Sequence, residues 1–141
     1  MSQENVETVR RAIAAVNDRD VDAYLACCTE DVQMRTPLAS IGAVYEGADA
    51  IRRFFVDIQD TVPDFRVELE RLDAIEHGRV LALVRITATG RASGLPAASD
   101  MPAANVYELT DGKIRRVRIF LDRKEALEAV GLSEQDAHAD S

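Results

Sequence analysis

The chain has 141 residues, enough for one domain with a substantial core. Its 25 acidic and 17 basic residues give a formal net charge of -8, which argues against a nucleic acid or an anionic membrane as the main partner. The first residues lack the basic and apolar regions of a signal peptide, and no apolar run approaches the ~20 residues of a membrane span. We therefore expect a cytoplasmic protein with one domain at 1–132 and a disordered tail at 133–141.

The cysteines and histidines point to no cofactor. Cys27 and Cys28 are adjacent within a predicted helix, a position that suits neither a stabilising disulfide nor a metal site. The sequence contains no metal-ligand spacing, no phosphate-binding glycine loop and no nucleophile elbow. We expect both cysteines to be small buried side chains and the protein to need no cofactor or metal.

Apolar residues at helical spacing predict three helices in the first half of the chain. The first spans about 3–18, with a stripe of Val6, Val9, Ile13 and Val16. Asp20 is the expected N-cap of a second, shorter helix. The third begins after Gly47 and ends before Pro63, because proline cannot continue a helix.

The strands follow a period of two. A turn at 29–31 is expected to lead into a short strand at 32–36, followed by an irregular segment up to Gly47. Strands are expected at 65–76, with a bulge at Glu70-Arg71, and at 80–89 after a turn at His77-Gly78. Gly90 to Pro102 is expected to form a loop, either a lid or a plain mobile connection.

The segment 103–122 predicts a hairpin. Asp111-Gly112 supplies the two turn residues that tolerate positive φ. In the second strand, Val117, Ile119 and Leu121 share one face, and Arg116, Arg118 and Phe120 share the other. A short closing helix at 123–130 is expected to end at Gly131.

These elements predict an α+β fold: a cone-shaped, curved antiparallel sheet wrapped around three N-terminal helices. Only one face of the sheet can contact these helices, so we expect the opposite face to meet water or a second subunit.

Several motifs support a family resemblance. They include Asn17 and Asp20 between the first two helices, Tyr45-Glu46-Gly47 before Ile51-Arg52-x-Phe54-Phe55, Asp111-Gly112-Lys113-Ile114, and Phe120-Leu121-Asp122-Arg123. The chain resembles a SnoaL-like domain of the nuclear transport factor 2-like superfamily, which includes ketosteroid isomerases, polyketide cyclases and limonene epoxide hydrolases. The resemblance covers about 5–132. It implies the cystatin-like fold described above, but this fold carries enzymes, binding proteins and transport factors alike.

The catalytic groups of these relatives are not found at the matching positions. Where ketosteroid isomerases place an aspartate base, a tyrosine and a protonated aspartate, this chain has Thr36, Ala12 and Asn105. Where the epoxide hydrolases place an arginine and two aspartates, it has Val84, Ile86 and Ile119. The resemblance therefore predicts no recognisable catalytic set.

On this register one set of side chains faces the interior of the cone, and we call it the inward set. It consists of Tyr24, Met34, Thr36, Phe54, Phe55, Val84, Ile86, Asn105, Tyr107, Val117, Ile119 and Leu121. An apolar cup with few polar groups is typical of a small-molecule pocket, although the same side chains could fill the space as an ordinary core. We expect it to bind a small apolar ligand.

The alternative is an enzyme, an isomerase, cyclase or hydrolase acting on a polyketide-like or steroid-like substrate. Asn105 and Tyr107 would polarise a carbonyl, and the base would come from Asp100, Asp122 or the loop. Both assignments have structural alternatives. Asn105 could be satisfied by Tyr107, Thr36 or backbone, and Asp122 could cap the closing helix.

The outward side chains Arg85, Thr87, Arg116, Arg118 and Phe120 form a basic and aromatic face in an acidic protein. Many members of the resembled family dimerise through this face, and an isologous interface would let the arginines meet acidic groups of the mate. We expect a homodimer, with a solvated face and local ion pairs as the alternative.

Overall fold

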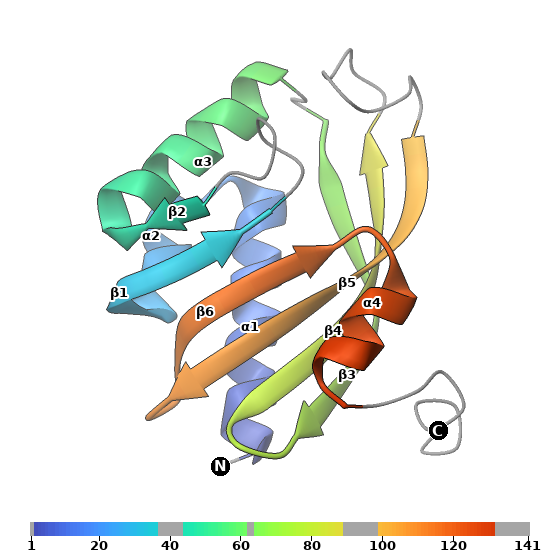
Figure 1. The fold of residues 1–141 in the computed structure, drawn as a ribbon. Coiled ribbons are helices and arrows are strands. Elements are labelled where there is room, and N and C mark those ends of the chain that lie inside the picture. Colours follow the sequence, from blue (N-terminus) through green and yellow to red (C-terminus); the bar gives the residue numbers. More distant parts are fainter. Residues whose placement is uncertain (1, 37–43, 62–63, 89–98, 132–141) are drawn as a thin grey trace.

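The computed structural model describes residues 2–36, 44–61, 64–88 and 99–131. Four helices and six strands make up this part of the chain (Figure 1). Their bounds in chain order are α1 Ser2–Asp18, α2 Val21–Ala26, β1 Cys28–Arg35, β2 Val44–Glu46, α3 Gly47–Thr61, β3 Arg66–Ile75, β4 Arg79–Ala88, β5 Ser99–Thr110, β6 Lys113–Phe120 and α4 Arg123–Ala129. The predicted helices and the predicted strands are all present, and β2 is an additional strand.

The strands form one curved sheet in the order β2-β1-β6-β5-β4-β3. β1 runs parallel to β6, whereas the other neighbouring strands of the described sheet pair antiparallel. The predicted bulge is confirmed, because the β3–β4 register shifts between Leu69 and Arg71. The fold is therefore α+β with helices packed on a curved sheet, as expected. The sheet is not purely antiparallel, because β1 and β6 form a parallel pair near one edge.

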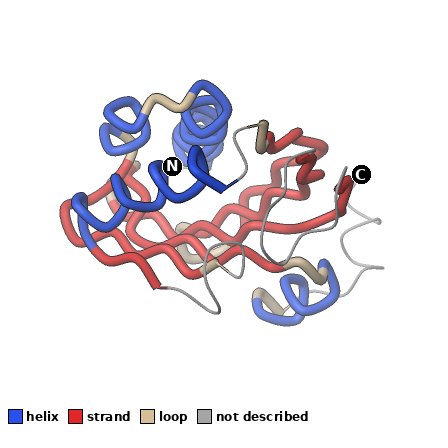
Figure 2. Tube along the Cα trace, turned by 90° about the horizontal axis from the view of Figure 1, so that it is seen from above, coloured by secondary structure: helices blue, strands red, loops and turns tan. Residues whose placement is uncertain are grey.

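Helices cover both faces of the sheet. α1, α2 and α3 lie on one face and α4 lies on the other (Figure 2). The expectation that the opposite face meets only water or a second subunit was wrong, because α4 buries part of it. There Ala126, Leu127 and Val130 pack on the β4 and β5 side chains Leu81, Ala104 and Val106.

Three local predictions require correction. Residues 29–31 lie within β1, whose pairing with β6 is irregular between Cys28 and Gln33. Val44–Glu46 forms β2 rather than irregular chain. Residues 99–102 of the predicted loop belong to β5, where they continue the pairing with β4, and 89–98 and the predicted tail lie outside the described residues.

The hairpin turn is confirmed. Asp111 and Gly112 have φ values of 53° and 76°, which places both turn residues in the left-handed region. Both central residues of a type I′ hairpin turn require positive φ, and this turn matches the twist of the flanking strands. The Thr8 hydroxyl of α1 donates a 3.0 Å hydrogen bond to the Gly112 carbonyl, which joins the turn to the helical layer.

The exposed edge of β3 is held by the end of α1. The Asn17 side chain donates from Nδ2 to the Val67 carbonyl at 2.9 Å, and its Oδ1 accepts from the Val67 N–H at 2.8 Å. β3 is the last strand of the sheet, so on that side no further strand supplies these bonds. The Asn17 amide acts there as a substitute for a neighbouring strand.

The turn before β4 allows a direct test of backbone packing. Gly78 has a φ of +70°, and a Cβ atom added there would lie 2.8 Å from the Leu109 carbonyl oxygen. We expect Gly78→Ala to lower the free energy of unfolding by about 2 kcal/mol, because strain and a backbone clash add together. Chemical denaturation measures this change. Gly131→Ala is the control, since it has a φ of +79° with nothing within 4 Å; equal losses in both variants would contradict the clash.

Candidate functional site

A small cavity lies between the helices and the inner face of the sheet. Its volume is about 30 Å³. It is lined by Ile13, Val16, Tyr24, Met34, Phe54, Phe65, Val67, Asn105, Tyr107, Val117 and Ile119. We call it the inner cavity. It is large enough for a water molecule but, in this conformation, far too small for a typical organic ligand.

The structure places most of the inward set around this cavity or in the core beside it. Seven members line it, namely Tyr24, Met34, Phe54, Asn105, Tyr107, Val117 and Ile119. Phe55, Val84 and Ile86 belong to the same buried core cluster without lining the cavity. Thr36 is buried but does not line this cavity. Leu121 is 38% exposed, so the expectation that Leu121 faces the interior was wrong. β6 ends at Phe120, and the inward alternation ends with it.

Asn105 and Tyr107 supply hydrogen-bonding groups to the otherwise apolar lining of the inner cavity. They are two residues apart on β5 and both are buried, and Asn105 Nδ2 donates a 3.0 Å hydrogen bond to the Tyr107 hydroxyl oxygen. Asn105 Oδ1 is buried and has no hydrogen-bond partner among the described residues. The Tyr107 hydroxyl can bond to only one end of the Asn105 amide. Whichever way the amide is turned, its other polar group has no hydrogen-bond partner among the described residues. An unsatisfied group of this kind costs about 1–3 kcal/mol, which favours a water or a ligand atom at this position.

Aromatic side chains pack together where α3 meets β2 and α2. The ring of Phe54 meets that of Tyr45 edge-on at 5.4 Å, and Phe55 meets Tyr24 in the same way at 5.4 Å. The Tyr45 hydroxyl donates a 2.8 Å hydrogen bond to Asp57 Oδ2 on α3. These contacts fix the rings of α3 against β2 and α2.

The three tyrosines of the chain predict a loss of stability at alkaline pH. Burial, assisted by the hydrogen bond to Asp57, raises the pKa of Tyr45 from 10.0 to about 12, and burial also raises the pKa values of Tyr24 and Tyr107. A tyrosine with a raised folded-state pKa stabilises the fold below its unfolded pKa, and this contribution is lost as pH rises through the folded pKa. We therefore expect the free energy of unfolding to fall between pH 10.0 and about 12.

Tyrosinate absorbance, followed together with circular dichroism, checks this expectation. While the chain is folded, tyrosine ionisation should occur well above pH 10.0, and Tyr45→Phe should reduce its amplitude. A tyrosine that titrates near pH 10.0 in the folded chain would contradict it.

A larger groove lies where β1, β2 and β6 meet the start of α4. Its volume is about 590 Å³. It is lined by Arg35, Thr36, Val44, Arg118, Ile119, Phe120, Leu121, Asp122 and Glu125. We call it the outer groove. Because it lies at strand ends, side chains from both faces of the sheet reach it, and Ile119 lines both this groove and the inner cavity.

Sequence reasoning missed three residues of the outer groove, Arg35, Val44 and Glu125. Arg35 follows the inward Met34, and Val44 precedes the buried Tyr45. The alternation of each strand therefore assigns both to the outward side, and only the ends of neighbouring strands bring them together. No local signal in the sequence indicates such a groove.

The candidate Asp122 lies in the outer groove rather than along the inner cavity. It is also the N-cap of α4, where its carboxylate accepts a 2.9 Å hydrogen bond from the Lys124 N–H. The structure thus brings Asn105 and Tyr107 together and places Asp122 elsewhere.

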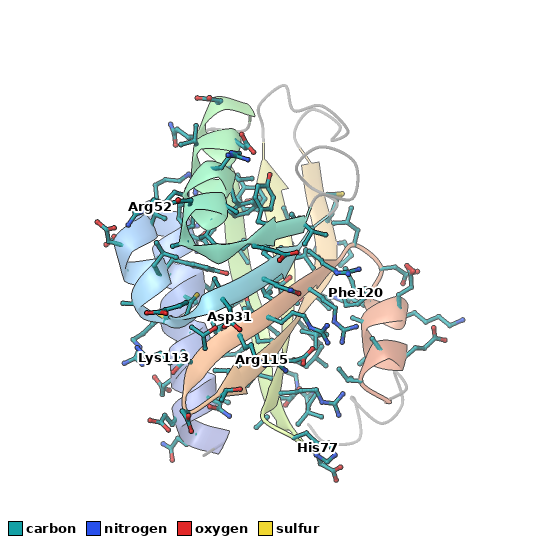
Figure 3. All side chains as sticks on the ribbon, turned by 60° about the vertical axis from the view of Figure 1, so that its left-hand side comes forward. Asp31, Arg52, His77, Lys113, Arg115 and Phe120 are labelled. Atoms are coloured by element: carbon teal, nitrogen blue, oxygen red, sulfur yellow. The ribbon has the colours of Figure 1, made fainter. Side chains whose placement is uncertain are left out.

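The predicted subunit-interface residues lie on the outer face of the sheet, some of them with acidic partners in the same chain. Arg85 pairs with Glu70 at 3.4 Å, and Arg116 Nε donates a 2.7 Å hydrogen bond to Glu108. The Arg118 guanidinium lies 5.7 Å from the ring centroid of Phe120. Phe120 lies beside α4, and Arg115 lies farther from it (Figure 3).

Within residues 2–36, 44–61, 64–88 and 99–131, no group of three or more His, Cys, Asp or Glu side chains is arranged to hold a metal ion. The helices in those ranges are also too short or too polar to cross a membrane.

The protein is thus a curved sheet covered by helices, with an inner cavity that contains Asn105 and Tyr107 and an outer groove at the strand ends. The profile of the SnoaL-like domain family matches residues 9–117. The chain therefore belongs to the SnoaL-like family, as its sequence motifs suggested. A search of curated proteins found no match.

Solved structures share this fold. Bal32a, from a soil-derived mobile gene cassette, is 27% identical with a TM-score of 0.73, covering 84% of this chain and 88% of its own. A cystatin-fold protein from Novosphingobium aromaticivorans is 26% identical with a TM-score of 0.69, covering 85% and 98%. A protein with a ketosteroid isomerase-like fold from Catenulispora acidiphila, in complex with trimethylamine, is 17% identical with a TM-score of 0.71, covering 89% and 93%.

Proposed function

We propose that this SnoaL-like protein binds a small molecule with an apolar body in the outer groove, with the inner cavity as an uncharged polar contact. The observation that carries the proposal is the groove itself. Its volume of about 590 Å³ is within the usual range for small-molecule sites, and Val44, Ile119, Phe120 and Leu121 give it apolar walls. Two of these side chains are unusually exposed for their type, Val44 at 45% and Leu121 at 38%.

The inner cavity would orient the ligand. Tyr107 accepts its hydrogen bond from Asn105, so its own hydroxyl hydrogen remains available as a donor, while Asn105 Oδ1 is available as an acceptor. Ile119 lies between these groups and the groove. A rotamer change of Ile119 would join the two spaces, and the remaining inward-set residues would then form the apolar surroundings of the ligand. The trimethylamine complex of a relative supports small-molecule binding on this fold.

Fluorescence titration with N-phenyl-1-naphthylamine, a neutral apolar probe, tests the proposal. We expect saturable binding at one site per chain. Leu121→Glu should weaken binding about tenfold, because it places a charge on an apolar wall. Val56→Glu is the matched control, since Val56 is an exposed apolar residue of α3 that does not line the groove. Equal affinities of both variants and the parent chain would contradict a site in this groove.

An enzyme is the alternative, as an isomerase, cyclase or hydrolase for a polyketide-like or steroid-like substrate. The observation in its favour is that a hydroxyl donor and an amide lie together at the inner cavity, where they would polarise a carbonyl. This alternative predicts that Tyr107→Phe abolishes turnover of a β,γ-unsaturated ketone and leaves the affinity for the neutral probe unchanged. The binding proposal expects no turnover from the parent chain.

We also propose that the chain forms a homodimer through the outer sheet face that carries Arg85, Thr87, Arg116, Arg118 and Phe120. Arg85 and Arg116 pair closely with acidic partners within the chain, whereas Arg118 approaches Glu108 only to 4.0 Å, so Arg118 and the half-buried Phe120 are the expected centre of the contact. Size-exclusion chromatography with light scattering should give the mass of a dimer. A monomer at micromolar concentration would overturn this proposal.

A further inference from the structure

Two arginines line the outer groove, and further arginines lie near them on the sheet. Arg35 and Arg118 are register partners in the parallel β1–β6 pair, and both line the groove. Arg116 lies two residues before Arg118 on the same face, and the register continues from Arg116 through Glu108 to Arg79. Four arginines therefore occupy paired or nearby positions on neighbouring strands, with Glu108 in register between Arg116 and Arg79.

The Glu108 carboxylate already has two arginine partners. Glu108 accepts a 3.0 Å hydrogen bond from Arg115 on one oxygen and a 2.7 Å bond from Arg116 on the other. Arg118 approaches the second oxygen only to 4.0 Å. Glu108 therefore neutralises Arg115 and Arg116 much more effectively than it neutralises Arg118.

Arg118 is the member of the cluster with unused binding capacity. Its side chain is 27% exposed, and its Nε is buried without a hydrogen-bond partner in the described part of the chain. Burial lowers the pKa of Arg118, and the charges of Arg116, Arg79 and Arg35 lower it further, while Glu108 acts in the opposite direction. Since an arginine remains charged even so, its environment favours an added negative charge.

The groove around Arg118 is amphipathic. The guanidinium lies 5.7 Å from the centre of the Phe120 ring, which leaves its hydrogen-bonding edge for another group. Val44 and Leu121 supply exposed apolar surface in the same groove. Asp122 and Glu125, at the start of α4, also line it and would repel an anion placed beside them. A negative charge is thus favoured only at the β1–β6 wall.

We propose that the ligand of the outer groove is an amphipathic organic anion, whose carboxylate or equivalent oxyanion group binds Arg35 and Arg118 while its apolar body lies against Val44 and Leu121. This inference rests on the proposed small-molecule function and specifies the ligand class. Two arginines at one wall give a planar oxyanion several charge-assisted donors. The apolar walls give the rest of the molecule its buried surface.

A pair of fluorescent probes tests the charge requirement. 1-Anilinonaphthalene-8-sulfonate and N-phenyl-1-naphthylamine share the same apolar body, and only the first carries an anionic group. We expect Arg118→Gln and Arg35→Gln each to weaken binding of the sulfonate about tenfold and to leave the neutral probe unchanged. Arg10→Gln is the control, because it removes the same charge from the surface of α1, where Arg10 pairs only loosely with Glu7 at 3.6 Å.

The outcomes separate the inference from the function on which it rests. Sulfonate affinities that match the parent chain in both groove variants, with the neutral probe still bound, would overturn the anion site and leave apolar binding intact. Equal weakening of both probes would also overturn it, because the arginines would then shape the groove rather than bind the charge. Failure of the parent chain to bind either probe would contradict the proposed function. Arg35 is the register partner of Arg118 on the same outward side of the sheet, so light scattering of both arginine variants is needed to separate ligand contact from subunit contact.

Discussion

Replacing Asn17 by leucine is expected to lower the free energy of unfolding by about 3 kcal/mol, one of the two largest effects that we predict. The Asn17 amide makes hydrogen bonds of 2.9 Å and 2.8 Å to the carbonyl and N–H of Val67. Leucine has a similar volume but neither bond, so both backbone groups of this edge strand lose their partner. Val67 is 7% exposed, which limits the access of water as a replacement.

Chemical denaturation of Asn17→Leu against Asn5→Leu measures this effect. Asn5 lies on the same helix and is also buried, but its Oδ1 has no partner among the described residues. Removing an unsatisfied polar atom should be close to neutral. If both variants lose the same stability, the link between α1 and β3 does not hold the edge strand.

Arg123→Met should weaken both the fold and the groove. Arg123 is the first residue of α4, and it donates hydrogen bonds to the carbonyls of Val84 at 2.6 Å and Ala103 at 3.1 Å, and to Glu70 beside the bulge. Its loss should lower the free energy of unfolding by about 2 kcal/mol, since charged hydrogen bonds contribute more than neutral ones. Because α4 supplies Asp122 and Glu125 to the outer groove, we also expect about tenfold weaker binding of the neutral probe.

The neighbouring residue provides the control for this prediction. Lys124→Met removes the same charge from the first turn of α4, but Lys124 is exposed and only its backbone N–H bonds to the Asp122 cap. The two variants should differ in denaturation midpoint and in probe affinity. Indistinguishable variants would show that charge in the first turn of α4 matters and that the contacts to the sheet do not.

Sequence reasoning succeeded where short-range chemistry decides the structure. Asp20 and Asp122 cap the helices that follow them, and the positive φ of Asp111 and Gly112 closes the hairpin as expected. The bulge near Glu70 was visible as a break in the alternation of apolar residues. Each of these features depends on residues within a few positions of one another.

The errors arose where a distant partner overrides the local signal. Residues 29–31 are polar enough for a turn, but β6 pairs with Cys28 before this segment and with Gln33 after it, which keeps the segment in the strand. Pro102 lies in a stretch rich in glycine, serine and proline, yet it is the register partner of Arg85 on β4. The outer groove had no local signal at all, because it exists only where the ends of β1, β2 and β6 meet α4.

Methyl NMR of isoleucine-labelled protein, titrated with the neutral probe, tests the central claim most directly. Ile119 lines both the outer groove and the inner cavity, whereas Ile114, on the same strand, is fully buried and lines neither. A ligand in the groove should shift the Ile119 δ1 methyl signal saturably and leave that of Ile114 nearly unchanged. If the probe binds while Ile119 stays fixed and signals elsewhere move, the ligand site is not where we place it.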